Sequence, residues 1–311
     1  MMENLGTGPA APLHDAAPMV ECIWRGPARL GECPIWDDRR RYLYWIDSLD
    51  RKIWRAGAAG EEPVATTLPS DIGSIGLCQD ERFIAGLADG FAFVTFRAGS
   101  DAVVEWIADP DPRQADTRLN DGKVDRQGRF WCGTMNRHFA TANAALYRLD
   151  KDLSWRRMDD GFTVSNGIAF SPDGRRMYFS DSRVDRSYQY DLDPQTGGLS
   201  NRRAFLDTAA YAGRVDGATI DAQGNYWGAL FEGGAVGCFS PQGRLIRRVA
   251  LPVRCPTMCA FGGTDMDVLY VTSAIFLMQD AELAAEPLAG SLFAIHGLGA
   301  RGIPEPRFLG T

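Results

Sequence analysis

One short unit recurs along this chain at nearly constant spacing, and that spacing constrains the fold more than any other feature. Each copy has a polar residue, a short strand, a tight turn ending in glycine and a second strand; the clearest copy, 164–182, reads VSNGIAFSPDGRRMYFSDS. In three copies the polar residue precedes the turn glycine by 8 positions: Asn120 to Gly128, Asn166 to Gly174 and Asp216 to Gly224. In a fourth copy Glu32 lies 12 positions before Tyr44, and Asn166 likewise lies 12 positions before Tyr178.

These copies belong to a series of six units, which predicts an all-β fold, a six-bladed β-propeller. The turn glycines at 128, 174 and 224 are 46 and 50 positions apart, close to the repeat lengths of propeller blades. Short β-branched and aromatic runs fill the units, whereas helical periodicity is scarce. Six units of four short strands close into a ring. Val20–Trp24 is the extra strand that would complete the last blade.

We expect one domain preceded by a tail. Residues 1–19 contain acids and prolines without a continuous apolar block, so they do not form a secretory signal. They are expected to be disordered or loosely attached. No linker or low-complexity segment interrupts the later units, which predicts a single propeller domain over residues 20–311.

Charge and cysteine content narrow the expected partners and location. The net charge of −7 argues against nucleic acid or an anionic membrane as a partner, because both attract basic patches. No apolar run approaches the roughly 18 residues of a spanning helix. The seven cysteines are scattered, without a CxxC pair, as expected of reduced, mostly buried thiols in a cytoplasmic protein. No feature implies a protein partner.

Four oxygen-bearing side chains hold equivalent positions in four of the units: Glu32, Asn120, Asn166 and Asp216. Each precedes the first strand of its unit, which in a propeller lines the channel, and roughly 20 Å of extended chain separates it from the turn. The four should therefore converge at one mouth of the channel. A single Asn or Asp before glycine is usually a turn former. Glu32 is not, and the four together indicate a shared ligand.

Two carboxylates with one or two amide oxygens form a hard-oxygen site for one divalent cation, whether Ca²⁺, Mg²⁺, Mn²⁺, Zn²⁺ or Fe²⁺. So few protein ligands leave positions open for water and substrate, which is typical of a catalytic site. Only three histidines occur, which disfavours histidine-bound zinc and a Ser-His-Asp triad. No phosphate- or dinucleotide-binding glycine motif is present.

Several stretches resemble the sugar-lactone lactonase family, which includes gluconolactonases, regucalcin (senescence marker protein) and luciferin-regenerating enzymes. They are GECPIW, RLNDGKVDRQGRFWCGTM, SNGIAFSPDG followed by MYFSD, and VDGATIDAQGNYW, and the resemblance covers essentially the whole chain from about Leu30. It implies a propeller with one divalent metal in the channel mouth. By motif, it implies that Glu32, Asn166 and Asp216 bind the metal, and that Arg118 and Asn120 contact the substrate.

The chain departs from the family just after the GTM of the third unit. Several relatives carry a substrate-contacting Glu there, whereas this chain continues Asn136-Arg137-His138. The sugar preference of those relatives is therefore not carried over. His138 either replaces the missing contact or is a solvated loop residue.

The resemblance implies a metal-dependent hydrolase that opens a sugar (aldono-) lactone to the aldonic acid, in sugar catabolism. The cation would act as a Lewis acid on the lactone carbonyl. Asp216 is the candidate base if one of its oxygens stays free of the cation, and a cation-activated hydroxide is the competing nucleophile. Arg118 would hold ring hydroxyls or the developing carboxylate. Two alternatives stay open: hydrolysis of another lactone or ester (aryl, fatty or organophosphate) at the same site, and a non-enzymatic calcium-binding propeller.

Overall fold

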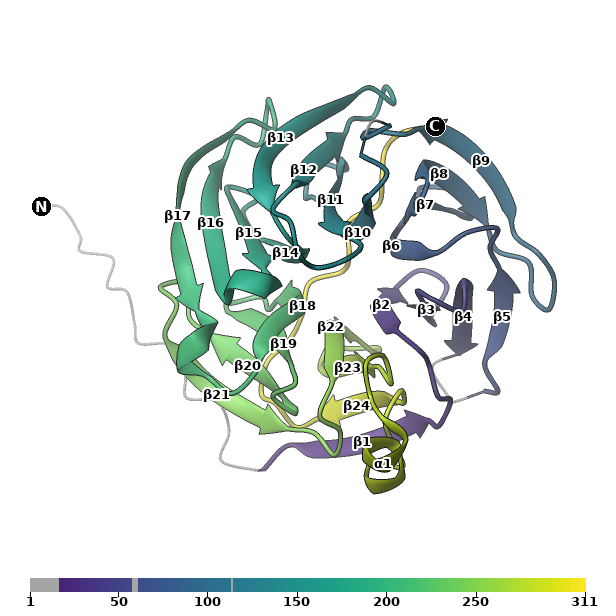
Figure 1. Ribbon diagram of the computed structural model, residues 1–311, viewed down its shortest axis with the longest axis vertical. Coiled ribbons are helices and arrows are strands. Elements are labelled where there is room, and N and C mark those ends of the chain that lie inside the picture. The colour runs from purple at the N-terminus through teal and green to yellow at the C-terminus, as the bar shows by residue number, and fades with distance from the viewer. Residues whose placement is uncertain (1–16, 58–60, 113) are drawn as a thin grey trace, which may run out of the picture.

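The strands form six four-stranded antiparallel sheets, arranged as blades around a central channel (Figure 1). The structure is a computed structural model that describes residues 17–57, 61–112 and 114–311. The sequence prediction of an all-β, six-bladed β-propeller is confirmed. In each blade the first strand lies nearest the channel, and the inner strands of neighbouring blades contact one another around the ring.

The first three blades follow the chain directly from the inner to the outer strand. Blade 1 contains β2 (Gly31–Asp37), β3 (Tyr42–Asp47), β4 (Lys52–Gly57) and β5 (Val64–Thr67). Blade 2 contains β6 (Ile72–Leu77), β7 (Arg82–Leu87), β8 (Gly90–Thr95) and β9 (Val103–Ala108). Blade 3 contains β10 (Thr117–Val124), β11 (Phe130–Asn136), β12 (Ala144–Leu149) and β13 (Trp155–Phe162).

Blades 4 and 5 repeat this order, and blade 6 closes the ring. Blade 4 contains β14 (Ser165–Phe170), β15 (Arg176–Asp181), β16 (Arg186–Leu192) and β17 (Leu199–Asp207). Blade 5 contains β18 (Arg214–Ile220), β19 (Tyr226–Phe231), β20 (Ala235–Phe239) and β21 (Leu245–Ala250). Blade 6 contains β22 (Pro256–Gly262), β23 (Val268–Ser273), β24 (Leu292–His296) and, as its outer strand, β1 (Met19–Trp24).

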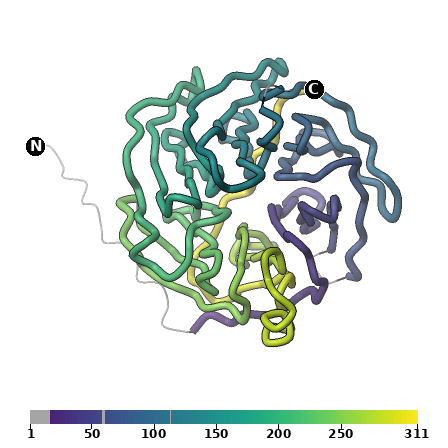
Figure 2. Tube along the Cα trace, in the orientation of Figure 1, coloured from purple at the N-terminus to yellow at the C-terminus, as the bar shows by residue number. Residues whose placement is uncertain are grey.

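Ring closure joins the first and the last strand of the chain in one sheet. β1 pairs antiparallel with β24 (Figure 2), so the predicted closing strand is confirmed and begins one residue earlier than expected. Residues 1–16, the greater part of the predicted tail, lie outside the described residues. A single domain over 20–311 remains our proposal.

The helical elements are short and lie in loops: η1 (Ser182–Val184), η2 (Thr208–Ala210) and α1 (Asp280–Ala285). Within the described part of the chain, no helix has the length and apolarity that crossing a membrane requires.

The hydrophobic core lies between the blades. Each of six buried clusters draws its side chains mainly from two neighbouring blades. Four tryptophans that pack between blades are each no more than 2% exposed: Trp36, Trp45, Trp131 and Trp227. Burying an aromatic or aliphatic side chain of this size contributes roughly 1.5–3 kcal/mol. Packing across every blade junction makes the ring a rigid frame for residues at its centre.

A buried aspartate fixes the inner turn of two blades. In blade 5 the Asp221 carboxylate accepts hydrogen bonds from the backbone N–H groups of Gln223 and Asn225, at 2.9 and 2.8 Å. It also accepts one from the indole Nε1 of Trp227, at 2.9 Å. Asp125 does the same for the turn and Trp131 of blade 3. The repeated Asp, Gly and Trp of the sequence motif are therefore structural.

The chain after β24 crosses the ring on the far side, where Figures 1 and 2 show it in yellow. Gly302 forms a bridge to Asp221 in blade 5, and Phe308 forms one to Cys78 beside blade 2. Between them, the ammonium group of Lys123 donates a hydrogen bond to Glu305, at 3.1 Å. This segment covers one end of the channel and leaves the opposite mouth for the cavity described below.

Asp221→Ala should destabilise the fold by about 2–4 kcal/mol, because it leaves a buried indole N–H and two backbone amides without acceptors. Thermal and urea unfolding measure the change. The matched control is Glu62→Ala at an exposed position, which should change stability by less than about 0.5 kcal/mol. Equal effects of the two substitutions would contradict the structural role of Asp221.

Candidate active site

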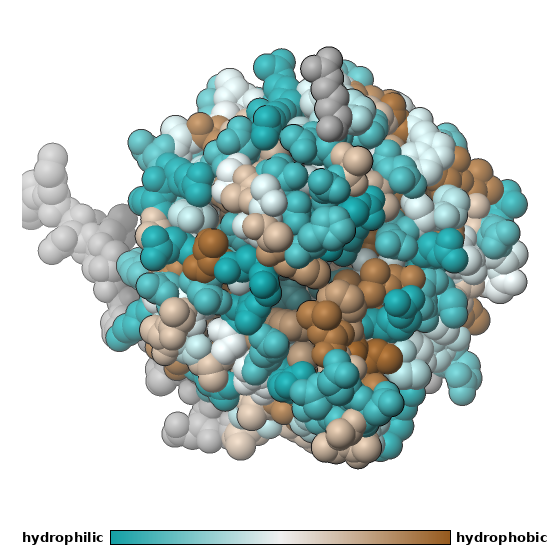
Figure 3. All heavy atoms as spheres, viewed as in Figure 1, coloured by the Kyte–Doolittle hydropathy of each residue, from teal (hydrophilic) through white to brown (hydrophobic). Residues whose placement is uncertain are grey.

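A cavity of about 370 Å³ opens at the mouth of the channel, among the inner ends of the blades. All five residues predicted to bind metal or substrate line it: Glu32, Arg118, Asn120, Asn166 and Asp216. They come from the inner strands of blades 1, 3, 4 and 5, so residues far apart in sequence meet here. In Figure 3 the centre of this face is hollowed, and apolar side chains gather along one side of the hollow.

Interruptions of strand pairing place the polar residues at the mouth. The register between the first and second strands shifts after Glu32 in blade 1 and after Asn166 in blade 4. The same shift occurs after Leu119 in blade 3 and after Val215 in blade 5. A β-bulge of this kind adds an unpaired residue and redirects the neighbouring side chains. The bulges therefore turn the residues at these strand starts toward the channel axis.

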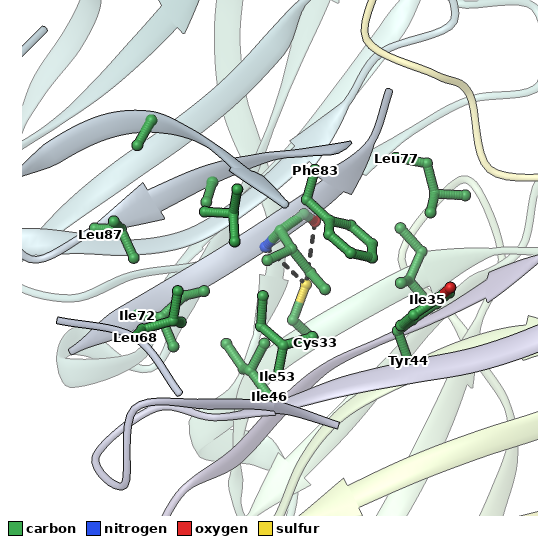
Figure 4. Packing of buried hydrophobic residues seen from close by; sticks show 14 of the residues in the cluster. Cys33, Ile35, Tyr44, Ile46, Ile53, Leu68, Ile72, Leu77, Phe83 and Leu87 are labelled. Atoms are coloured by element: carbon green, nitrogen blue, oxygen red, sulfur yellow. Dashed lines mark hydrogen bonds between the residues drawn. The ribbon is translucent and has the colours of Figure 1, made fainter. Parts of the chain in front are cut away.

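Cys33 anchors the bulge that carries Glu32. Its φ of 47° lies in the left-handed region, which disfavours non-glycine residues. Its side chain points into the apolar cluster between blades 1 and 2 (Figure 4). There Sγ donates to the carbonyl of Ile75 at 3.4 Å and accepts from the N–H of the same residue at 3.3 Å. Burial raises the pKa of the Cys33 thiol to about 12, so it stays neutral and serves as an anchor.

Aspartates at the ends of two second strands hold the chain that enters the site. Asp181, the last residue of β15, accepts hydrogen bonds from the N–H groups of Thr163 and Val164, at 2.9 and 3.1 Å. Those residues lead directly into β14 and Asn166. Asp47, at the end of β3, likewise accepts hydrogen bonds from the N–H groups of Arg29 and Leu30, at 2.9 and 3.2 Å. These two residues lead directly into β2, which carries Glu32. Both site strands therefore begin from a fixed point.

The amide group of Asn166 is oriented by two neighbours. Its Nδ2 donates to the hydroxyl of Ser182 at 2.9 Å, and Ser182 donates in turn to the carbonyl of Val215 at 2.6 Å. The Asn166 Oδ1 accepts a hydrogen bond from Asn120 Nδ2 at 3.0 Å. Because a carbonyl oxygen has two lone pairs, Oδ1 keeps one for a ligand. Ser182 thus joins Asn166 to the strand segment just before Asp216.

Three carboxyl groups meet in the interior of the site without full compensation. Burial raises the pKa of Glu32 well above its ordinary value, and the charges of Asp216 and Asp121 raise it further. Burial and the charge of Asp121 likewise raise the pKa of Asp216. Burial raises the pKa of Asp121 to about 6, although its Oδ2 accepts a hydrogen bond from the N–H of Ile168 at 2.8 Å. Such crowding is unfavourable unless a cation or a function requires it.

Arg118 supplies the nearest buried positive charge. Its side chain is 7% exposed and donates from Nη1 to the carbonyl of Leu119 at 2.9 Å. Burial lowers its pKa to about 10, Asp71 and Glu32 oppose that shift, and the neighbouring charge of Arg137 adds to it. Arg118 therefore faces both the carboxylates and the open cavity.

His138 does not line the cavity. Its imidazole is 72% exposed and lies 3.7 Å from the carboxylate of Asp116. Of the two roles open to it from the sequence, the structure favours that of a solvated loop residue.

The donor set fits a hard divalent cation better than a soft one. Among the described residues, no three histidine, cysteine, aspartate or glutamate side chains are placed to hold a metal by themselves. A cation between the carboxylates of Glu32 and Asp216 would therefore need an amide oxygen as well, and Asn166 presents one at the cavity wall. All-oxygen sets of this kind suit Ca²⁺, Mg²⁺ or Mn²⁺, and the two negative charges match the cation.

Sequence reasoning missed several residues of this site. Asp121 directly follows Asn120, but it belongs to the bulge and so falls outside the repeated spacing. Ser182 and Arg183 begin η1 after β15, outside the polar-residue-to-glycine spacing on which the site prediction rested. Phe139 and Phe276 reach the cavity from loops, and loop shape is not encoded in strand periodicity.

Asp216→Asn should stabilise the metal-stripped protein by about 1–2 kcal/mol, because it removes one of the repelling charges at constant size. Folding raises the pKa of Asp216, so the folded state binds its proton more tightly than the unfolded state does. The penalty in the wild type therefore grows as pH rises above about 4, and the advantage of the variant grows with it. Thermal unfolding across pH measures the difference. The exposed-turn control Asp173→Asn should give no gain, and a less stable Asp216→Asn at every pH would contradict the account.

Comparisons with known proteins place this site in a family. The family described as SMP-30/Gluconolactonase/LRE-like region matches residues 30–275. The chain is 37% identical to the 6-deoxy-6-sulfogluconolactonase of Pseudomonas putida, over 94% of this chain and 99% of that protein. It is 35% identical to the regucalcin of Gallus gallus, over 94% and 98% respectively.

Solved structures agree with the sequence relatives. A luciferin-regenerating enzyme superposes with a TM-score of 0.88 at 30% identity, covering 94% of this chain and 99% of that one. A calcium-binding protein, regucalcin, from Agrobacterium tumefaciens superposes with a TM-score of 0.87 at 28% identity, covering 94% and 97%. The chain belongs to the SMP-30/gluconolactonase/luciferin-regenerating-enzyme family.

Proposed function

We propose that this protein is a divalent-metal-dependent lactonase that opens a sugar (aldono-) lactone to the aldonic acid, in sugar catabolism. The observation that carries the proposal is a pair of carboxylates, Glu32 (partly buried) and Asp216 (buried), beside the amide of Asn166 on the wall of an open cavity. A cation that neutralised this pair would keep its remaining coordination positions on the cavity side, where a substrate enters.

The relatives support lactone hydrolysis in particular. One of them is a 6-deoxy-6-sulfogluconolactonase, and it aligns with nearly the whole of both chains. Regucalcin relatives, one of them described as calcium-binding, support a divalent cation. The cavity, at about 370 Å³, has the volume of a small-molecule site.

Each site residue has a distinct part in the proposed reaction. Glu32, Asn166 and Asp216 would hold the cation, which when bound supplies Lewis-acid polarisation of the lactone carbonyl. Among the described residues, the Asn120 side chain hydrogen-bonds only through its amide nitrogen, to Ser165 and Asn166, so its oxygen can accept a bond from a ring hydroxyl. Arg118 presents a planar set of donors to ring hydroxyls or to the developing carboxylate.

Asp216 is the proposed general base. Burial and the charge of Asp121 raise the pKa of its carboxyl, which would offset part of the lowering of that pKa by a bound dication. It can accept the proton of the attacking water only from an oxygen that the cation leaves free. The proton can then pass to the ring oxygen as the ester bond breaks, which completes opening to the acid.

The other two readings of the site differ from this one in turnover and in substrate. A non-enzymatic calcium-binding propeller would bind the cation without hydrolysis, but a buried Arg118 beside the carboxylates gives such a site no advantage. A hydrolase of an aryl or fatty lactone or an organophosphate would use the same residues. Apolar side chains on the cavity wall, Phe139, Phe276 and Leu277, favour such apolar substrates, so an activity assay must include them beside the sugar lactones.

The proposal predicts cation-dependent proton release from five- and six-membered aldonolactones. Metal-stripped protein should be inactive and should regain activity when one divalent cation is added back. Asp216→Ala should abolish hydrolysis, a loss of at least about 100-fold, because it removes both a ligand and the base. Asp173→Ala, at the turn distant from the cavity, is the matched control and should keep wild-type activity. Hydrolysis by the Asp216→Ala variant at the wild-type rate would refute the assignment.

Ser182→Ala should weaken cation binding by about 10–100-fold, because it frees the Asn166 amide from its hydrogen-bond partner. Calorimetric titration of metal-stripped protein measures this directly, without any substrate. Ser200→Ala, at an exposed position of β17, is the control and should bind as the wild type does. Unchanged affinity in Ser182→Ala would show that this hydroxyl does not orient the ligand.

A further inference from the structure

The cavity wall carries two arginines that the proposed reaction does not use. Arg137 follows β11 in blade 3, and Arg183 lies in η1 after β15 in blade 4. Both are exposed and both line the cavity above the buried carboxylates. They lie on neighbouring blades, on one arc of the rim.

Charge balance separates these two arginines from the other charged groups of the cavity. Its lining includes four carboxylates and four guanidinium groups: Glu32, Asp71, Asp216 and Glu232 with Arg118, Arg137, Arg183 and Arg214. Arg214 forms an ion pair with Glu232, at 2.6 Å. Arg118 interacts with Asp71 and Glu32. A divalent cation would neutralise Glu32 and Asp216, so the remaining excess of positive charge belongs to Arg137 and Arg183.

Neither arginine has a carboxylate partner in the part of the chain that the structure describes. Toward the residues that the structure describes, the guanidinium group of Arg137 donates only from Nε, to the carbonyl of Thr117 at 3.0 Å, which leaves both of its terminal nitrogens for a ligand. The guanidinium of Arg183 lies 5.6 Å from the ring centroid of Phe139. A contact of this kind needs no N–H donor, and among the described residues the guanidinium of Arg183 donates no hydrogen bond that would compete with a ligand.

An aromatic pair supports this arc of the rim. The centroid of the Phe139 side chain lies 6.3 Å from that of Phe276. Phe276 comes from the loop after β23 in blade 6, on the opposite side of the propeller. The contact holds Phe139, and Arg183 packed against it, in position at the mouth. Two guanidinium groups close together at a concave opening concentrate positive potential there.

We propose that Arg137 and Arg183 select lactones that carry a strong anionic group, a sulfonate or a phosphate, on the carbon chain away from the ring carbonyl. The proposal rests on the function proposed above, since it assigns the substrate class of the same site. The carbonyl end would lie at Glu32, Asn166 and Asp216, and the anion would lie toward blades 3 and 4. Planar guanidinium groups bind tetrahedral oxyanions through paired hydrogen bonds.

The test compares matched lactones that differ only in the tail: glucono-1,5-lactone, its 6-phosphate, and its 6-deoxy-6-sulfonate. Wild-type protein should prefer an anionic lactone to the neutral one in kcat/KM, and the preference should shrink as salt rises. Arg137→Gln and Arg183→Gln should each lower the anionic-to-neutral ratio by about tenfold. Arg175→Gln, in the distant turn of blade 4, carries the same charge change and should leave the ratio unchanged. The phosphate and sulfonate arms show which anion is preferred.

A binding measurement separates this proposal from the proposed function. Calorimetric titration with gluconate and with 6-phosphogluconate, the ring-opened acids, needs no turnover. Tighter binding of the phosphorylated acid, weakened about tenfold in Arg137→Gln, supports the anion site even if no lactone is hydrolysed. Hydrolysis of all three lactones at equal efficiency, with ratios unaffected by either substitution or by salt, would overturn the anion site and leave the lactonase proposal standing.

Discussion

The electrostatic repulsion between two carboxylates, Glu32 and Asp216, is the constraint on which the rest of the site depends. Their burial and the nearby charge of Asp121 raise the pKa of both groups, so the metal-free fold is less stable than it would be with neutral side chains. A flexible scaffold would relieve this repulsion by moving the strands apart. The propeller cannot do so, because each inner strand is fixed by packing on both neighbouring blades.

The same rigid frame explains how the side chains of the proposed metal ligands are oriented. Glu32 depends on the bulge at Cys33, whose thiol is bound to the backbone of Ile75 in the next blade. Asn166 depends on Ser182, which is bound to the strand of blade 5. Each ligand position is therefore held by contacts that cross a blade junction.

The repeat spacing predicted the ring, its closing strand and the meeting of four oxygen-bearing side chains at one mouth, whereas Arg118 was predicted from the family resemblance alone. These features follow from strand periodicity, which is a local property of the sequence. The bulges were not predictable, because nothing in the amino-acid sequence indicates that Cys33 adopts a positive φ. Asp121 was hidden by the same bulge, and Arg183 and Phe276 reach the cavity from η1 and a loop. Arg137 was noticed only as a departure from the family pattern, since its free nitrogens are visible only in three dimensions.

The central claim is that one cation binds between Glu32, Asn166 and Asp216. Anomalous diffraction from crystals grown with Mn²⁺ tests it most directly, because manganese can be located without reference to activity. The account predicts a single strong anomalous peak within coordination distance of an oxygen from each of the three side chains. A well-ordered crystal with no peak at that position, or with the manganese bound elsewhere, would contradict it.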